Sequence, residues 1–174
     1  MGQHGGVTVA IRSALSAEIE AVREIERASA QRFVGLMDAI AADEPSPTTV
    51  LAQRLADGGL LVATVDEALA AFVMFRPLDD HLYVEQIDVL PAFAGRRLGA
   101  ALLDAVSERA RILDLAGLVL STFRDVPWNA PYYRRLGFVA LETLTPGLLA
   151  VRAEHLARGL DESQRLFMAR PSRD

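Results

Sequence analysis

A short segment rich in glycine and arginine, Gly95 to Gly99, stands between an apolar stretch that ends at Leu90 and a long amphipathic stretch that begins at Leu98. Unpaired amides at a helix N-terminus, with the positive end of the helix dipole behind them, bind anions. Glycine lets a ligand approach the backbone closely, and Arg96 and Arg97 add charged donors. The segment therefore predicts a site for a phosphate or pyrophosphate; the alternative is a plain helix start with solvated arginines.

The composition excludes several kinds of chemistry. The 174 residues include no cysteine, which removes a thiol nucleophile, thiolate metal ligands and disulfides. All 18 cationic side chains are arginine, so a lysine Schiff base and a lysine-containing phosphate loop are excluded as well. A formal net charge of -5 disfavours a nucleic-acid partner and permits an amine substrate. The longest apolar run, Ala68 to Phe75, is far too short to cross a membrane.

Alternating and helical patterns supply the elements that must position this segment. Two tight connections in the middle of the chain, Asp66-Glu67 and 77–81, indicate an antiparallel meander. The first half of the chain predicts a strand at 7–12, a helix from an N-cap at Ser16 to about Arg32, a loop at 43–49, a short helix at 49–56, and strands at 60–65, 68–76 and 82–90.

The second half alternates helices with strands. A strand, a helix and another strand in sequence imply a crossover with parallel pairing, so the sheet is expected to be mixed. The patterns predict a long helix that ends before Gly117, a strand at 118–122, a helix ending at Leu136 with Gly137 as its left-handed cap, a strand at 138–141, a helix opened by Thr145-Pro146 and closed by Gly159, and a strand at 165–170.

Two motifs together resemble one family. Val89-x-Pro91 followed by Gly95-Arg96-Arg97-Leu98-Gly99 resembles the acyl-CoA pyrophosphate loop of the GNAT superfamily of N-acetyltransferases. Further along, Asn129 and the run Tyr133 to Phe138 resemble the family's Asn…Tyr-x-x-x-Gly-Phe segment. The resemblance spans about residues 7–170. It implies a GNAT-like α/β fold, with a central mixed sheet of about seven strands flanked by helices on both faces.

The loop departs from the family's usual Gln/Arg-x-x-Gly-x-Gly/Ala pattern. With Gly99 aligned, Ala94 stands at its first position and Arg97 replaces its first glycine. A positive φ at Arg97 would be strained, because only glycine adopts that conformation without cost. The loop amides can still donate, so we expect CoA binding to persist.

The resemblance assigns acetyl-CoA as the acyl donor and gives roles to individual residues. The amides of the loop would hold its pyrophosphate, the strand end would pair with the pantetheine arm, and one strand amide would polarise the thioester carbonyl. Tyr133 would give its proton to the departing thiolate. The residues assigned to the donor are Ile87, Asp88, Val89, Gly95, Arg96, Arg97, Leu98, Gly99, Ala100, Asn129 and Tyr132.

An amine acceptor must lose a proton, and Glu85 is the candidate base. It lies four residues before Val89 on the same strand face, where family members often place an acid or a histidine; Tyr83 shares that face and an ordered water is the alternative base. Asp88 is expected on the opposite face unless a bulge reverses it. An ordinary solvated strand residue remains the other reading of Glu85.

Other polar residues have structural readings. Asn129 fits a helix cap as well as a cofactor ligand, and Tyr133 fits a core aromatic. Asp79 and Asp80 are expected to be turn residues, with attraction of a cationic acceptor as the alternative. The three histidines, His4, His81 and His155, show no metal spacing and are expected at the surface.

These observations predict a single N-acetyltransferase domain at 7–170, after a frayed or vector-derived segment at 1–6 and before a tail at 171–174. It would be bacterial and cytoplasmic, and would acetylate a primary amine of a small molecule or peptide through a ternary complex. Acceptor specificity is expected in the region from Phe33 to Gly59 and in the connection before the last strand. No metal, nucleic acid or membrane partner is expected, and a homodimer is a family expectation. A non-catalytic acyl-CoA sensor is the alternative function.

Overall fold

The computed structural model describes residues 5–172, which contain seven strands and six α-helices. The strands are β1 (Val9–Ser13), β2 (Leu60–Val65), β3 (Ala68–Leu78), β4 (His81–Val89), β5 (Gly117–Phe123), β6 (Val139–Ala140) and β7 (Arg165–Pro171). The helices are α1 (Ile19–Ala30), α2 (Asp38–Ala41), α3 (Thr48–Ala56), α4 (Leu98–Ile112), α5 (Ala130–Arg135) and α6 (Pro146–Ala157), with 3₁₀ turns at Ser16–Glu18, Gln31–Phe33, Pro91–Phe93 and Glu162–Gln164.

The strands form one sheet in the order β1-β2-β3-β4-β5-β7-β6. β4 and β5 run parallel because α4 carries the chain back between them, whereas β1–β2, β2–β3, β5–β7 and β6–β7 pair antiparallel. The predicted mixed sheet of an α/β fold is therefore confirmed.

The chain divides into two compact units, one built from 1–74 and 86–103 and the other from 75–85 and 104–174. The single domain expected over 7–170 stays a prediction. Residues 1–4 of the expected N-terminal remnant and 173–174 of the expected tail lie outside the described residues.

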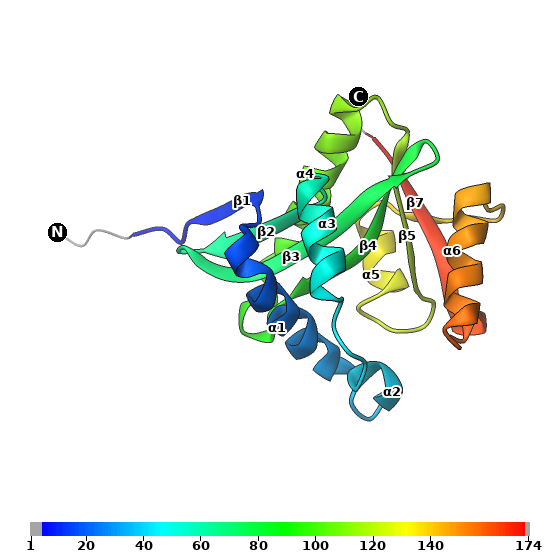
Figure 1. The fold of residues 1–174 in the computed structure, drawn as a ribbon, viewed down its shortest axis with the longest axis horizontal. Helices are drawn as coiled ribbons and strands as arrows, with labels where there is room; N and C mark the ends of the chain where they lie inside the picture. Colours follow the sequence, from blue (N-terminus) through cyan, green and yellow to red (C-terminus); the bar gives the residue numbers. More distant parts are fainter. Residues whose placement is uncertain (1–4, 173–174) are drawn as a thin grey trace. The chain divides into compact units, whose positions relative to one another are not determined.

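In the first unit, α1 and α3 lie side by side and pack on the β2–β3 hairpin (Figure 1). Their apolar positions recur at helical spacing, and the facing strand residues alternate, so both sets meet in one cluster. Asp66 and Glu67 both have positive φ, which suits the two-residue turn of this hairpin. The cluster consists of Ala14, Val22, Ile25, Leu51, Leu60, Val62, Phe72 and Met74.

The expected N-cap at Ser16 is wrong. Residues 16–18 form a 3₁₀ turn, and the Glu18 carboxylate reaches back to accept a hydrogen bond of 2.8 Å from the Leu15 amide. Arg12 pairs with the same carboxylate at 2.7 Å and lowers the pKa of Glu18. The longer acidic side chain thus fixes the entry to α1 in place of a serine cap.

In the second unit, α6 packs on one face of β4, β5 and β7, and α4 contacts the other face of β7. Thr145 caps α6 as predicted, because its hydroxyl accepts from the Leu148 amide at 3.3 Å. Arg170 in β7 reaches Asp104 and Ser107 of α4. The α6 side consists of Tyr83, Val119, Leu148, Val151 and Phe167.

Every strand except β2 differs from its predicted bounds by one or more residues, and the differences at β3, β4 and β6 have structural causes. β3 and β4 extend to Leu78 and from His81, so only Asp79 and Asp80 form the turn. β6 is shorter than 138–141, since the Phe138 amide bonds the Tyr133 carbonyl at 3.1 Å instead of joining the sheet.

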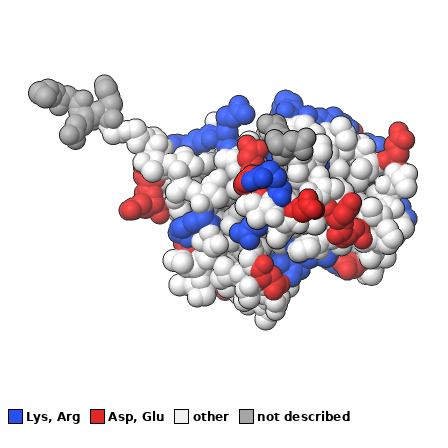
Figure 2. Space-filling view, turned by 90° about the horizontal axis from the view of Figure 1, so that it is seen from above, with Lys and Arg blue, Asp and Glu red and all other residues white. Residues whose placement is uncertain are grey.

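Charged side chains of both signs share the surface. Figure 2 shows acidic and basic groups interspersed over the face that it draws. Many are neighbours along a helix, such as Arg23 with Glu20 and Arg111 with Glu108. Among residues 5–172, no helix combines the length and the apolar character that crossing a membrane requires.

Candidate functional site

The loop between β4 and α4 leads from exposed residues, Gly95 to Arg97, into a first helical turn whose residues, Leu98 to Ala100, are buried. Gly95 and Arg97 both have positive φ, of 79° and 59°. The Arg97 carbonyl accepts the first helical hydrogen bond from the Ala101 amide at 3.0 Å. The amides of the first helical turn, Leu98 to Ala100, therefore have no acceptor within the helix and can bind an anion.

Arg97 adopts the left-handed conformation that usually requires glycine. A non-glycine residue there costs about 1 kcal/mol, and the surrounding loop imposes it. The bend expected of the family's glycine is thus retained with an arginine in its place. Arg97 itself is exposed, so its guanidinium can reach a ligand at the helix start.

Arg96 is the second exposed cation of the loop. Its guanidinium lies 5.5 Å from the centre of the Phe93 ring, on the 3₁₀ turn that follows β4. A cation over an aromatic face is held in place while its outer nitrogens stay available. The loop thus combines three amides that have no acceptor within the helix with two exposed cations.

Asp88, near the end of β4, lies against α1. Its carboxylate accepts from Gln86 Nε2 at 2.6 Å and is hydrogen-bonded to Ser29. Burial raises the pKa of Asp88 to about 7, with nearby Glu26 adding to the shift and Arg32 opposing it. The Asp88 side chain therefore binds to α1 and to Gln86. The role that the resemblance assigns to 87–89, pairing with the pantetheine arm, then falls to the backbone of these residues.

Glu26 extends this buried polar cluster to the loop before α3. Its two carboxylate oxygens accept from the Ser46 amide at 3.0 Å and from the Ser46 hydroxyl at 3.2 Å. Arg23 donates to the Ser46 carbonyl at 3.1 Å. Burial raises the pKa of Glu26, so two carboxyl groups of raised pKa connect α1 to this loop and to β4.

In the second unit, Glu85 is neither fully buried nor simply solvated. Its carboxylate lies 3.5 Å from Arg76 Nε, and its side chain is 16% exposed. The Arg76 guanidinium also lies over the Tyr83 ring at 5.4 Å. Burial raises the pKa of Tyr83 to about 12, so its phenol is neutral at physiological pH. Of these three, Glu85 is the group that can accept a proton.

Tyr133 and Asn129 come from the short helix α5. Tyr133 is buried, and its ring meets those of Phe138 and Tyr132 edge to face at 5.6 and 5.5 Å. Asn129 stands at the start of α5, but its side chain makes no capping hydrogen bond. Its buried amide oxygen has no hydrogen-bond partner among the described residues, so the helix-cap reading does not account for this side chain.

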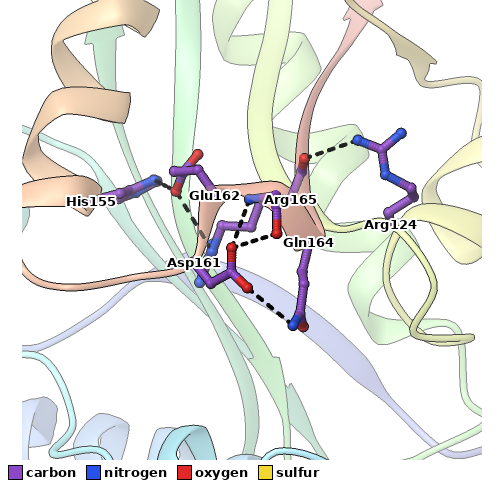
Figure 3. Close-up of polar contacts among 7 residues, drawn as sticks. Arg124, His155, Asp161, Glu162, Gln164 and Arg165 are labelled. Carbon is purple, nitrogen blue, oxygen red and sulfur yellow. Dashed lines mark hydrogen bonds and ion pairs between the residues drawn. The ribbon is translucent and has the colours of Figure 1, made fainter.

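The expectation that His155 lies at the surface is wrong. Its side chain is 11% exposed, and its ring is stacked on Phe167 with 5° between the planes. Nδ1 lies 2.7 Å from Glu162, as Figure 3 shows, and burial lowers the pKa of His155. A lone histidine in a polar stretch gives no sequence signal of burial, because the cover comes from β7. His81 pairs with Asp80 at 2.6 Å, and His4 lies outside the described residues.

Asp79 has a structural role. Its carboxylate accepts from the Thr145 hydroxyl at 2.5 Å and from the Gly147 amide at 3.1 Å, at the N-terminus of α6. A Cβ on Gly147 would lie 2.5 Å from the same carboxylate oxygen, so the glycine is required for this contact. The turn reading of Asp79 is confirmed.

Within residues 5–172, no group of three His, Asp or Glu side chains is arranged for a metal ion.

Two polar residues of the second unit were not predicted from the sequence as parts of a site. Arg76 directly follows the apolar run that ends at Phe75, and a charge at the end of a buried strand is a usable signal for a paired site. Arg165 opens β7 with its guanidinium 4.4 Å from the Phe123 ring. Its position depends on the pairing of β5 with β7, which no local pattern reveals.

Comparison with known proteins places the chain among acetyltransferases. Residues 19–138, more than half of the chain, match the acetyltransferase (GNAT) family. The PaiA N-acetyltransferase from Thermoplasma acidophilum, in complex with coenzyme A, is 14% identical and aligns over 94% of this chain and 99% of that chain, with a TM-score of 0.71. A GNAT family acetyltransferase from Brucella melitensis, in complex with acetyl-CoA, is 22% identical over 76% of this chain and 84% of that chain, with a TM-score of 0.57.

A third solved structure, nourseothricin acetyltransferase, is 30% identical over 66% of this chain and 65% of that chain, with a TM-score of 0.52. The likeness to the first two structures shows the fold. The family match includes the β4–α4 loop and the segment from Asn129 to Phe138, the two motifs on which the resemblance rests. The chain belongs to the GNAT family of acetyltransferases.

Proposed function

We propose that this protein transfers the acetyl group of acetyl-CoA directly to a primary amine within a ternary complex. The observation that carries the proposal is the start of α4, where three amides without a helical acceptor follow a bend made by Gly95 and Arg97. The pyrophosphate of CoA matches this site in charge and in its many acceptor oxygens. The two CoA-bound structures with the same fold support this assignment.

The rest of the donor has candidate partners of suitable chemistry. The backbone of 87–89 would pair with the pantetheine arm as an added strand. The unpaired oxygen of Asn129 needs a hydrogen-bond donor, and the amide N–H groups of pantetheine are such donors. A donor on the ligand would remove the cost of leaving this buried oxygen without a hydrogen bond.

The reaction requires two proton movements around one acyl transfer. The amine nitrogen attacks the thioester carbonyl carbon, a C–N bond forms, and the C–S bond breaks as the tetrahedral intermediate collapses. The Tyr133 hydroxyl gives its proton to the departing thiolate of CoA. Glu85, or a water that it orients, takes the proton that the amine loses. Because the chain has no cysteine, no acyl-thiol enzyme intermediate forms on it.

Glu85 is suited to this task by its surroundings. Its side chain is partly accessible, and Arg76 Nε pairs with its carboxylate at 3.5 Å. A carboxylate can accept a proton from an ammonium group that approaches it. The 30% identical nourseothricin acetyltransferase supports a small molecule as the acceptor.

Calorimetric titration with acetyl-CoA and with CoA tests donor binding, and release of free thiol in the presence of a panel of amines tests transfer. We expect micromolar binding and thiol release with at least one amine. Gly99→Asp should abolish binding by placing a carboxylate against the pyrophosphate, while Gly99→Ala, as the neutral control, should weaken it much less. A folded protein that binds neither acetyl-CoA nor CoA would contradict the proposal.

A further inference from the structure

Arg165 carries a positive charge in a largely covered position at the start of β7. It stands opposite Phe123 at the end of β5, and its guanidinium lies 4.4 Å from the centre of that ring. The side chain is 16% exposed, and burial lowers the pKa of Arg165. The group stays charged at physiological pH, because arginine titrates far above it. A guanidinium in such a covered position is stabilised when an anion pairs with it, because a buried charge without a partner is costly.

The protein itself only partly provides that anion. Glu162 Oε1 lies 3.9 Å from Arg165 Nε, too far for a hydrogen bond, and the same oxygen is 2.7 Å from His155 Nδ1 (Figure 3). Burial lowers the pKa of His155, so the ring donates as a neutral group. Throughout residues 5–172, the Arg165 side chain makes no hydrogen bond. Its two terminal nitrogens thus have no hydrogen-bond acceptor among these residues.

Arg165 lies on the same face of the sheet as the candidate base. Tyr83 and Phe167 pack in one cluster, Glu85 follows Tyr83 by two residues on β4, and Arg165 precedes Phe167 by two residues on β7. Arg76 stacks over Tyr83 and is already paired with Glu85. This face of the sheet therefore carries two groups that differ in the ligands they bind: a carboxylate, which suits an ammonium group, and a guanidinium, which suits a carboxylate.

We propose that the acceptor is a small amino acid, an amine that carries a carboxylate on the same molecule, and that Arg165 binds this carboxylate. This inference rests on the proposed function, since it names the acceptor class of that reaction. The planar fork of arginine fits a carboxylate with two parallel hydrogen bonds, which fixes orientation as well as affinity. An amino acid bound this way presents its amino group to the remainder of the site. A peptide N-terminus or a diamine lacks the carboxylate.

The test compares amino acids with their carboxamides, which keep the amine and the side chain but lose the negative charge. Thiol release from acetyl-CoA gives kcat/KM for each pair. The wild-type protein should prefer the acid over the amide by about ten-fold or more, because an unmatched buried guanidinium strongly rejects the analogue. Arg165→Gln should remove this preference by raising KM for the acid about ten-fold to a hundred-fold, with KM for the amide nearly unchanged.

Matched variants separate binding from folding. Arg152→Gln removes an exposed arginine of α6 and should leave the acid-to-amide ratio unchanged. Arg165→Lys keeps the charge without the fork and should recover part of the ratio. A merely structural role for Arg165 would lower thermal stability and reduce activity with acids and amides together, leaving the ratio as in the wild type.

The inference is overturned if amides are acetylated as well as acids, if neither class is acetylated, or if Arg165→Gln lowers both activities equally. Titration with acetyl-CoA distinguishes this failure from that of the proposed function. Intact acetyl-CoA binding with no preference for acids contradicts the acceptor class alone. Absence of acetyl-CoA binding contradicts the proposed function itself.

Discussion

The guanidinium of Arg170 in β7 donates a hydrogen bond of 3.1 Å to the carbonyl oxygen of Leu136, at the end of the helix that carries Tyr133. The same side chain donates to the Ser107 hydroxyl at 2.8 Å and pairs with Asp104 at 3.3 Å. Its guanidinium also lies 5.0 Å from the centre of the Phe138 ring, which in turn packs on Tyr133. One buried arginine thus connects α4 and β7 to the C-terminal end of α5.

Replacing Arg170 should destabilise the protein more than replacing a surface arginine. Arg170→Leu leaves a partly buried carbonyl and a partly buried hydroxyl without their donor, which should cost about 2 kcal/mol of unfolding free energy. Arg134→Leu, at an exposed position of α5, is the control and should change it by less than about 1 kcal/mol. Urea denaturation measures both. Equal effects of the two substitutions would show that Arg170 does not hold α5.

Removing the Tyr133 hydroxyl should slow transfer without weakening the donor complex. Tyr133→Phe keeps the ring that packs on Phe138 and removes only the proposed acid, so kcat should fall about 100-fold. Calorimetry should give a Kd for acetyl-CoA within about three-fold of the wild type. Tyr132→Phe, its neighbour on the same helix, should affect kcat far less. Loss of acetyl-CoA binding in Tyr133→Phe would make this tyrosine a structural residue instead.

Local patterns were sufficient for most of the fold. The boundaries of β2 agree with the sequence residue for residue, and Thr145 with Pro146 opens α6 as their types predict. These features depend on neighbours along the chain: alternation, a cap and a proline at the first helical turn. The start of α1 differed from the prediction because the Glu18 carboxylate, and not the Ser16 hydroxyl, accepts the hydrogen bond that fixes the first turn.

The site was harder to predict where it depends on pairing between distant segments. His155 is buried because Phe167 stacks on it, and Arg165 meets Phe123 only through the β5–β7 register. Asp88 contacts Ser29, nearly sixty residues away along the chain. Sequence periodicity gives the face on which a residue lies, but not which distant element covers that face.

The strained bend at Arg97 gives a prediction that separates backbone from charge. Arg97→Gly removes the penalty of a positive φ and should stabilise the folded protein by up to about 1 kcal/mol. Arg97→Ala removes the guanidinium but keeps the Cβ, so it should weaken CoA binding without this gain. Thermal denaturation and calorimetry measure the two effects. If glycine lowers stability relative to alanine, the bend is not a source of strain.

The contacts of Asp79 predict a loss of stability and no loss of acceptor affinity. Asp79→Ala removes the acceptor of the Thr145 hydroxyl and the Gly147 amide, which should cost about 1 kcal/mol. KM for the acceptor should stay within about two-fold. Asp80→Ala, at the exposed neighbour, should leave stability nearly unchanged. A raised KM in Asp79→Ala at unchanged stability would support attraction of a cationic acceptor.

The raised pKa of Asp88 makes stability depend on pH. Its ordinary value is 3.8, and in the folded protein it is about 7, so between these values the folded state holds a proton that the unfolded chain has released. The stabilisation is fully present below pH 3.8 and is lost as pH rises through 7. Ionisation at higher pH places a buried negative charge beside Glu26, whose pKa burial also raises.

Asp88→Asn imitates the protonated acid at every pH and should remove this dependence. Relative to the wild type, the variant should gain up to about 1.4 kcal/mol of unfolding free energy per pH unit between pH 4 and pH 7. Urea denaturation at pH 5, 6, 7 and 8 measures the difference, with the exposed Asp114→Asn as the control. A difference that does not change with pH would mean that Asp88 is ionised in the folded protein throughout this range, and that Gln86 and Ser29 suffice to stabilise its charge against α1.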